Sequence, residues 1–190
     1  MRDPVPPEED RPPSDRDLMA RAAGDDDLAF AELVRRHQDG LVNFFRRMGD
    51  YNDNAEDLAQ ETFLRLFRYR KAYRPRAKFS TFLYLLARRT WIDHCRAAGR
   101  RRRAYERLAA EAARNGEAES PASREVGARA AEALSRLSEE MRMVVVMSIY
   151  QGFKYREIAE ALRLPEGTVK SRMFHALRLL REALSDEDAP

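Results

Sequence analysis

Apolar residues recur at the three- and four-residue spacing of amphipathic helices along most of the chain, and β-branched runs are rare. The pattern predicts a short first helix that Ser14 caps and that Gly24 ends. A longer helix opens at the acidic residues 25–27 and ends at Gly49. Its expected inner face consists of Phe30, Leu33, Val34, His37, Leu41, Phe44, Phe45 and Met48. We interpret His37 as a core or boundary residue, because no second metal ligand follows it at helical spacing.

Two further helices complete the first half of the chain. A third helix begins near residue 53 or 54, and Pro75 breaks its pattern. Ser80 is expected to cap a fourth helix that runs to about Arg103. These four helices are expected to share one core. The inner face of the third helix consists of Ala55, Leu58, Ala59, Thr62, Leu66, Tyr69 and Tyr73.

Residues 104–128 differ in composition, being rich in Ala, Glu and Ser with turn signals at Asn115-Gly116 and Pro121. We expect a flexible linker there, whose first part can prolong the preceding helix. Further helices are expected at about 129–136, 139–150, 155–162 and 167–184. The sequence therefore predicts an all-α chain with two small helical domains, residues 15–103 and 129–185, joined by the linker 104–128, with a disordered tail at 1–14 and a short tail at 186–190.

The last two predicted helices have the length and spacing of a helix-turn-helix unit. Pro165 and Gly167 in "RLPEG" stop a continuous helix, and Thr168 is expected to cap the second one. In such a unit the second helix enters the major groove of DNA. The expected inner face of that helix consists of Val169, Met173, Ala176, Leu177, Leu180 and Leu184.

The other side of this last helix combines cations with an aromatic ring. Lys or Arg neutralises phosphates or binds guanine, Ser bonds to most base edges, and an exposed Phe can touch a thymine methyl group. The alternative is an ordinary amphipathic helix with a solvated basic face, in which Phe174 packs under a neighbour. The residues expected outside the packed face are Lys170, Ser171, Phe174, His175 and Arg178.

The fourth helix places aromatic and basic residues at matching intervals. Tyr84, Arg88, Trp91, Cys95, Ala98 and Arg102 share one face. Aromatic rings stack on unpaired bases, and guanidinium groups hold the phosphate backbone. An equally compatible interpretation makes Trp91 part of the core and leaves the arginines solvated.

The third helix carries a polar side formed by Asp57, Gln60 and Glu61. The simplest explanation is surface pairing, because Glu61 and Arg65 stand four residues apart. The alternative is a docking surface for another protein.

The net charge is only +3, but the charge is segregated. Residues 88–103 hold seven Arg against one Asp, and residues 154–181 hold seven Lys or Arg against three Glu. Two separate basic regions suggest two contacts with a polyanion.

Composition also narrows the class of protein. The single cysteine, Cys95, excludes an intramolecular disulfide and a cysteine zinc site, and fits a reducing compartment. No apolar run approaches the ~20 residues of a membrane span, and the N-terminus has no apolar signal core. We therefore expect a cytoplasmic protein without membrane contact, metal or other cofactor. The chain has no G-x-x-x-x-G-K-[ST] loop and no H-E-x-x-H motif, so we expect neither an enzyme nor a small-molecule substrate.

The chain resembles the extracytoplasmic-function sigma factors of bacteria in three stretches and in their order. These stretches are "AEDLAQETFLRLF", "KFSTFLYLLARRTWIDHCR" and "YREIAEALRLPEGTVKSR". The resemblance covers about residues 25–103 and 129–184. It implies a subunit that binds core RNA polymerase, directs it to promoters through minus-35 and minus-10 elements, and promotes strand opening. The implied partners are bacterial core RNA polymerase, promoter DNA as duplex and as melted strand, and, as for many relatives, an anti-sigma factor.

The resemblance also assigns residues. It implies polymerase contacts at Asp57, Gln60 and Glu61. It implies contacts with the melted minus-10 strand at Lys78, Phe79, Tyr84, Arg88, Arg89 and Trp91. It implies minus-35 contacts at Tyr155, Arg156, Thr168, Lys170, Ser171, Arg172, Phe174 and His175.

The distance between two promoter elements sets a requirement on the linker. A flexible linker of about 25 residues has an r.m.s. span of roughly 25–30 Å and a limit of roughly 80 Å. Elements about two DNA turns apart need roughly 70 Å. The linker must therefore be extended in the working complex.

Two other classes of protein use a helix-turn-helix unit. A stand-alone transcriptional regulator would bind its operator without core polymerase, but it leaves "AEDLAQETF" unexplained and needs a dimer seam that the sequence does not show. A recombinase would need a catalytic site, for which only scattered acidic residues are available.

Overall fold

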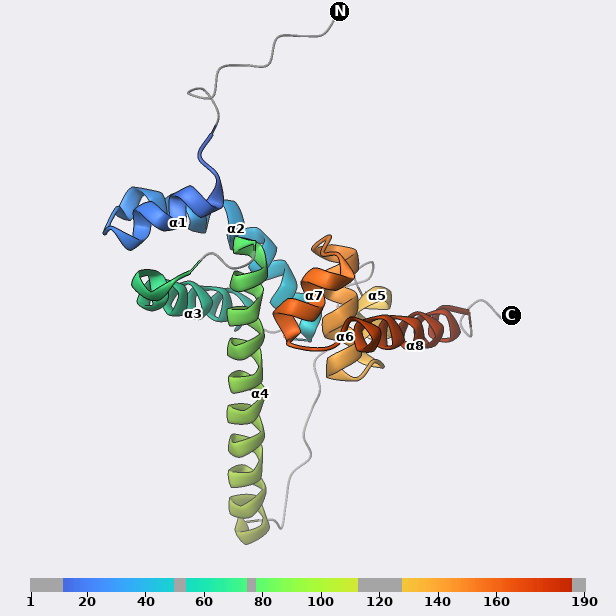
Figure 1. Cartoon of the computed structure of the whole chain (residues 1–190). Helices are drawn as coiled ribbons and strands as arrows, with labels where there is room; N and C mark the ends of the chain where they lie inside the picture. Colours follow the sequence, from blue (N-terminus) through green and yellow to red (C-terminus); the bar gives the residue numbers. More distant parts are fainter. Residues whose placement is uncertain (1–11, 50–53, 75–77, 113–127, 186–190) are drawn as a thin grey trace, which may run out of the picture.

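The computed structural model describes residues 12–49, 54–74, 78–112 and 128–185, which form helices and no strand (Figure 1). The N-terminal helices are α1 (Asp15–Ala23), α2 (Asp27–Met48), α3 (Asn54–Tyr69), the 3-10 turn η2 (Arg70–Ala72) and α4 (Phe79–Ala112). The C-terminal helices are α5 (Ala128–Ser135), α6 (Glu139–Val145), the π-helical turn η3 (Val146–Tyr150), α7 (Tyr155–Leu162) and α8 (Glu166–Ser185). The all-α prediction is confirmed. Residues 1–11, 113–127 and 186–190, which hold most of the expected tails and linker, lie outside the described residues.

The first two helices begin and end where the sequence predicts. Ser14 accepts a hydrogen bond from the Asp17 amide at 3.3 Å, and the Asp17 carboxylate accepts one from the Ser14 amide at 3.2 Å. This reciprocal pair is a capping box. Asp26 caps α2 by accepting from the Ala29 amide at 3.0 Å, and Gly49 ends α2 in the left-handed conformation at φ 114°.

The N-terminal core lies between α1, α2, α3 and α4. Phe44, Phe45 and Leu66 are completely buried in it. Tyr69, expected on the inner face of α3, is instead 52% exposed, because the helix gives way to η2 at the next residue and its last turn lies at the surface.

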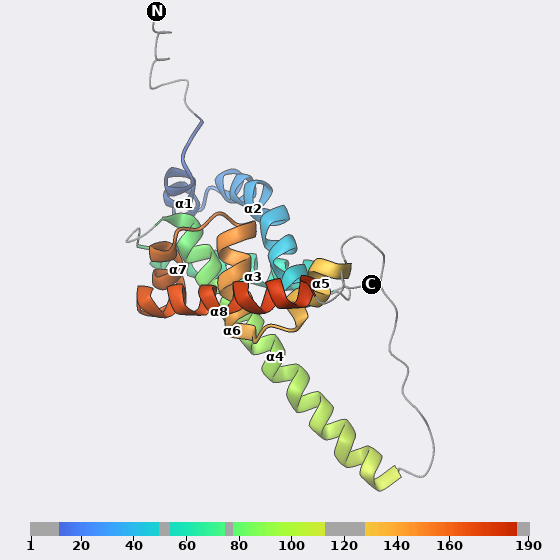
Figure 2. The same cartoon turned by 90° about the vertical axis from the view of Figure 1, so that its right-hand side faces the viewer.

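Helix α4 differs from its prediction at both ends. It begins at Phe79, and the Lys78 carbonyl accepts from the Phe82 amide, so Ser80 lies inside the first turn and is not the cap. At the other end the helix continues past Arg103 to Ala112, through the Ala- and Glu-rich residues that suit a helix as well as a linker. Its second half projects away from the rest of the molecule (Figure 2).

The C-terminal helices enclose a second group of buried residues around α6, with α8 packed on both α6 and α7. Val144, Met147 and Ile158 are completely buried there. Helix α8 begins at Glu166, so Thr168 lies in its first turn and does not cap it. Leu177 and Leu184 are 43% and 49% exposed, because no described element covers that side of the second half of α8.

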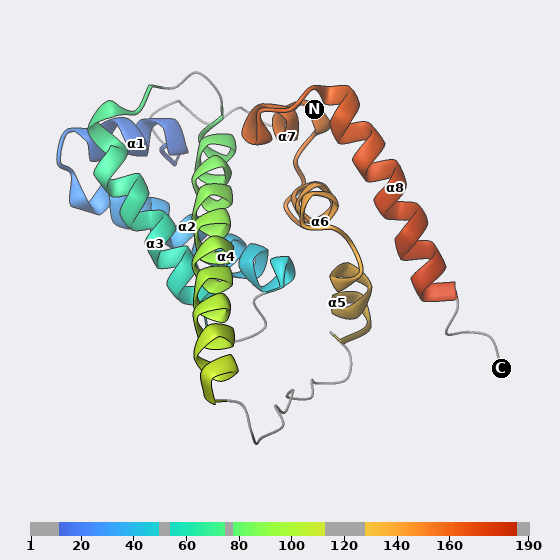
Figure 3. The ribbon, with the colours of Figure 1, turned by 90° about the horizontal axis from the view of Figure 1, so that it is seen from below.

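The two groups of helices pack against each other. Figure 3 shows α4 between the α1–α3 side and the α6–α8 side, and α2 reaching toward α6. The contacts join α4 to α7, and α2 to both α6 and η3. The start of α4 is therefore covered on two sides, by α3 and by the C-terminal domain.

Candidate functional site

The helix-turn-helix unit is built by α7, a short turn and α8. The Glu157 carboxylate accepts from the Lys154 amide at 2.9 Å and so fixes the start of α7. Arg163 ends α7 in the left-handed conformation at φ 55°, which turns the chain sharply toward α8. Val169, Met173 and Ala176 are buried and hold the first half of α8 against α6 and α7. The packed face predicted for this half of α8 is confirmed.

The opposite face of α8 is open to solvent. Lys170, Ser171, Phe174 and His175 are all exposed, and Phe174 keeps 68% of its surface accessible. Its ring lies edge-on to the His175 ring, with 5.7 Å between centroids. Glu166 pairs with Lys170 at 2.8 Å, and this ion pair raises the pKa of the Lys170 ammonium above its ordinary value. An exposed ring beside a fixed cation matches the chemistry of a groove-facing helix.

The other residues that the resemblance assigned to duplex DNA differ in availability. The Arg156 side chain is 84% exposed and pairs only loosely with Glu160, at 3.5 Å. Tyr155 and Thr168 are half-buried. The Arg172 side chain is 23% exposed and forms an ion pair with Glu140 of α6, so it also fastens α8 to the domain.

The aromatic face expected on α4 is not exposed. Phe79, Tyr84 and Trp91 are 5%, 4% and 7% accessible, so the core interpretation of Trp91 holds in this structure. These rings are buried because α4 is covered on two sides, by α3 and by the C-terminal domain. The spacing of apolar residues along one helix cannot reveal such covering. Arg89 is exposed, Arg88 is half-buried, and the Lys78 side chain is 69% exposed beside Glu157 of α7.

The exposed side of α3 presents Asp57 and Gln60 to solvent, as expected for a docking surface. Glu61 is half-buried and pairs with Arg65 at 2.8 Å, and Arg65 also reaches Asp93 of α4 at 2.7 Å. The simple pairing explanation therefore accounts for Glu61, but it does not account for Asp57 or Gln60.

Sequence reasoning missed a groove beside this surface. The groove has a volume of about 460 Å³ and lies between α2 and α3. Its apolar lining comes from Val34, Val42, Ala59 and Phe63, and Gln60 contributes to its edge. Val34 was predicted to lie on the inner face of this helix, but it is half-buried and lines the groove, and the spacing of apolar residues gave no sign of this.

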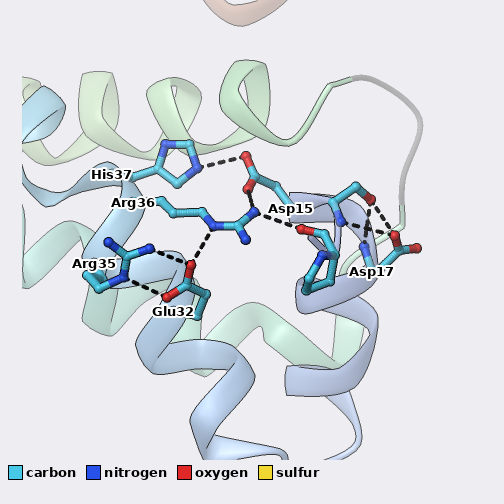
Figure 4. A network of polar contacts seen from close by, with 8 residues as sticks. Asp15, Asp17, Glu32, Arg35, Arg36 and His37 are labelled. Carbon is cyan, nitrogen blue, oxygen red and sulfur yellow. Dashed lines mark hydrogen bonds and ion pairs between the residues drawn. The ribbon is translucent and has the colours of Figure 1, made fainter. Parts of the chain in front are cut away.

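A charged network joins α1 to α2 (Figure 4). The Asp15 carboxylate pairs with Arg36 at 3.1 Å and with His37 at 2.8 Å. Two arginines bind Glu32 and lower the pKa of its carboxyl group to about 2. The His37 ring also lies 5.2 Å from the Phe79 ring, so this network supports the start of α4. His37 is thus a boundary residue, as the sequence suggested.

Within the described ranges, no group of three or more His, Cys, Asp and Glu side chains could hold a metal ion. None of the described helices is both long and apolar enough to cross a membrane.

The fold and these surfaces define a class of protein. The family model of sigma-70 region 2 matches residues 33–101, and that of sigma-70 region 4 matches residues 128–180. The first match falls on α2–α4 and the second on α5–α8.

Individual relatives narrow the class. The ECF RNA polymerase sigma factor SigE of Mycolicibacterium smegmatis is 36% identical to this chain. The matched region covers 81% of this chain and 61% of that relative's length. The RNA polymerase sigma-H factor of Pseudomonas aeruginosa is 30% identical over 90% of this chain and 93% of its own length. The solved structure of CnrH in complex with the cytosolic domain of CnrY is 26% identical and aligns with a TM-score of 0.70 over 92% of this chain and 99% of CnrH.

The chain belongs to the extracytoplasmic-function RNA polymerase sigma factors. It is a factor that directs RNA polymerase in transcription initiation, and sigma factors are not themselves catalytic. The stand-alone regulator considered above is therefore not supported.

Proposed function

We propose that this sigma factor uses three separate surfaces to start transcription in the bacterial cytoplasm. The exposed face of α8, with Lys170, Ser171, Phe174 and His175, reads the minus-35 duplex. The start of α4 receives the melted minus-10 strand. The exposed side of α3, with Asp57 and Gln60, docks on core polymerase. An anti-sigma factor is a further expected partner, as the family resemblance implies.

The observation that carries this proposal is the open face of α8. A ring that is 68% exposed on a helix with a well-buried opposite side contributes nothing to the core. Contact with a thymine methyl group gives such a ring a function, and the adjacent ammonium of Lys170 supplies a phosphate contact. Arg156, at the start of α7, extends the same positive surface.

The minus-10 surface is proposed in a revised form. Because Phe79, Tyr84 and Trp91 are buried, the first contacts with the strand would come from Lys78 and Arg89, whose charged groups are accessible. Arg88 is the next candidate along the helix. Stacking by the aromatic residues would require the start of α4 to be uncovered.

Core polymerase docking is the step that a single substitution can test. In run-off transcription with bacterial core polymerase and fragmented bacterial genomic DNA, the wild-type protein should give discrete transcripts, whereas Asp57→Arg should abolish them. Glu182→Arg is the matched control, because Glu182 is an exposed acid on α8, away from α3. Equal loss in both variants would assign the effect to general charge. Full activity of Asp57→Arg would refute the assigned docking surface.

A further inference from the structure

We propose that Arg163, in the turn between α7 and α8, binds a phosphate of the duplex that α8 reads, and that this contact explains a strained backbone at the turn. No role was assigned to this residue from the sequence. The inference rests on the proposed function in one respect, namely that the exposed face of α8 meets duplex DNA. The added contact is independent of base sequence, so it fixes the position of the helix-turn-helix unit on the duplex without reading bases.

The backbone of Arg163 is left-handed, which is unfavourable for a residue with a side chain. Its φ is 55° and its ψ is 49°. In this conformation the β-carbon of an L-residue lies too close to a neighbouring carbonyl oxygen. Helices that end in this way usually have glycine at the left-handed position. An arginine there therefore calls for an explanation.

The other left-handed positions show what Arg163 lacks. Within the described ranges, positive φ angles occur at Asp25, Gly49, Gly152 and Arg163. Two of these residues are glycines, and aspartate tolerates the conformation better than most residue types. The Asp25 carboxylate also binds two cations of η2, each at 2.8 Å, so ion pairs hold it in place. Arg163 has neither advantage.

The fold explains the turn but not the arginine. The Arg163 amide donates to the Glu160 carbonyl at 3.3 Å, a bond that almost any residue type could make. The next residue, Leu164, donates to the Ala159 carbonyl at 3.0 Å and packs against the core, so the sharp turn is needed. The Arg163 side chain itself is exposed, and no other described residue gives it a hydrogen bond or an ion pair.

Arg163 continues an exposed, charged side of α7 that lies beside the start of α8. Arg156 and Glu160 precede it by seven and three residues, and both are exposed. Seven residues of helix span about 10 Å. Lys170 and, more weakly, Arg156 lower the pKa of the Glu166 carboxyl group, so this side of α7 is close to the first turn of α8. The guanidinium of Arg163 therefore belongs to the same surface as the face that meets DNA.

The charges of this surface leave Arg163 as the cation best able to bind an anion. Arg156 pairs with Glu160 at 3.5 Å, and Lys170 pairs with Glu166 at 2.8 Å. Both of these cations are thus partly neutralised by an acid on their own helix, whereas Arg163 is not. A guanidinium can hold a phosphate through two parallel hydrogen bonds, and each phosphate contact with duplex DNA releases condensed counterions.

The test uses the full-length protein and a fluorescently labelled duplex of about 30 base pairs and mixed sequence, because phosphate contacts do not depend on sequence. Arg163→Gly and Arg163→Asn both remove the charge and suit a left-handed backbone. Arg163→Lys keeps both the charge and the strain. Arg16→Asn is the control, because Arg16 is exposed on α1, in the other domain. Fluorescence anisotropy at several salt concentrations gives the affinity and its salt dependence.

We expect Arg163→Gly and Arg163→Asn to be more stable than the wild type and to bind the duplex less tightly. Relief of the strain should raise the thermal midpoint by about 2–4 °C. Loss of one phosphate contact should reduce the log–log salt slope by about 0.9, which at about 0.1 M salt means roughly eightfold weaker binding. Arg163→Lys should keep the slope and show no gain in stability, and Arg16→Asn should leave the slope unchanged.

Opposite effects on stability and binding distinguish a DNA contact from a structural role, because a substitution that stabilises the fold gives no structural reason for weaker binding. Unchanged slopes in Arg163→Gly and Arg163→Asn would overturn the phosphate contact. An equal loss of slope in Arg16→Asn would assign the effect to net charge and would overturn it as well. An unchanged thermal midpoint would overturn the claim that the backbone is strained.

Lys170→Ala in the same assay reports on the proposed face of α8. A smaller slope for Lys170→Ala, beside unchanged slopes for Arg163→Gly and Arg163→Asn, would overturn the Arg163 contact and leave the proposed function standing. Unchanged slopes in all three variants would overturn both. Failure of the Arg163 contact and failure of the proposed function are therefore distinguishable.

Discussion

Arg142 provides the sharpest test of how this chain is held together, because its guanidinium has acceptors in both domains. It donates to the carbonyls of Leu134 at 2.8 Å, Leu137 at 3.1 Å and Met48 at 2.7 Å, all in part-buried surroundings. A fourth bond, to the Ser135 carbonyl at 2.9 Å, is exposed. Arg142→Met keeps the aliphatic stem and removes every donor.

The magnitude follows from the part-buried bonds. Each contributes a net of about 1 kcal/mol, and an acceptor left buried and unpaired costs about as much or more. Three such bonds give an expected loss of about 2–4 kcal/mol in the free energy of unfolding, a large share of the roughly 5–15 kcal/mol typical of a folded domain. About one third of this loss belongs to the Met48 bond, which exists only while the domains touch.

The assay is urea unfolding followed by circular dichroism, together with hydrogen exchange to locate the weakened segments. Faster exchange is expected in α5 and α6, and at the C-terminal end of α2. Arg178→Met is the control, because the Arg178 side chain is 60% exposed and pairs only with Glu182, at 3.8 Å. A loss below about 0.5 kcal/mol, the range of ordinary surface substitutions, would refute the assigned role of Arg142.

Three further outcomes are expected. Trp91→Ala should lower the free energy of unfolding by about 3–5 kcal/mol in thermal or urea unfolding, because Trp91 is buried; a loss near zero would contradict that burial. Lys170→Ala should reduce the log–log salt slope of promoter binding by about one, and an unchanged slope would show that Lys170 touches no phosphate. Ser14→Ala should destabilise the protein by about 1 kcal/mol through loss of the capping box, with Ser148→Ala, far from any cap, as the comparison.

Periodicity and capping chemistry predicted most of the helices. The short polar residues Ser14 and Asp26 and the left-handed Gly49 act locally, so their positions can be read from neighbouring residues alone. Ser80 and Thr168 have the same chemistry but lie within the first turn of their helices. Helix α4 already includes Phe79, and α8 already includes Glu166 and Gly167 although glycine is a poor helix former, so a capping residue type alone did not locate either start.

A functional surface could be predicted from the sequence when the residues that form it lie close together along the chain. The exposed face of α8 follows from the spacing of its buried residues, and Phe174 lies where that spacing placed it. Tyr84 and Trp91 could not be placed, because a helix covered on two sides has no single inner face. The contacts between the two domains join residues as far apart as Gly40 and Gln151, and the local sign of them in the sequence is a glycine inside a helix.

Acid offers a final test of the contacts between the two domains, because one attachment between them, the ion pair of Glu157 with Lys78, titrates. The Lys78 ammonium, and after it the Lys154 amide, lowers the pKa of the Glu157 carboxyl group below the ordinary value of 4.5. A lowered pKa means that the attachment contributes fully above pH 4.5 and is lost as the pH falls through the lowered value. The radius of gyration should therefore stay constant from pH 7 to the ordinary pKa of Glu157 and rise below it. In Glu157→Gln the side chain carries no charge at any pH, so this part of the rise should vanish. An identical rise in both proteins would assign the acid expansion to other titratable groups.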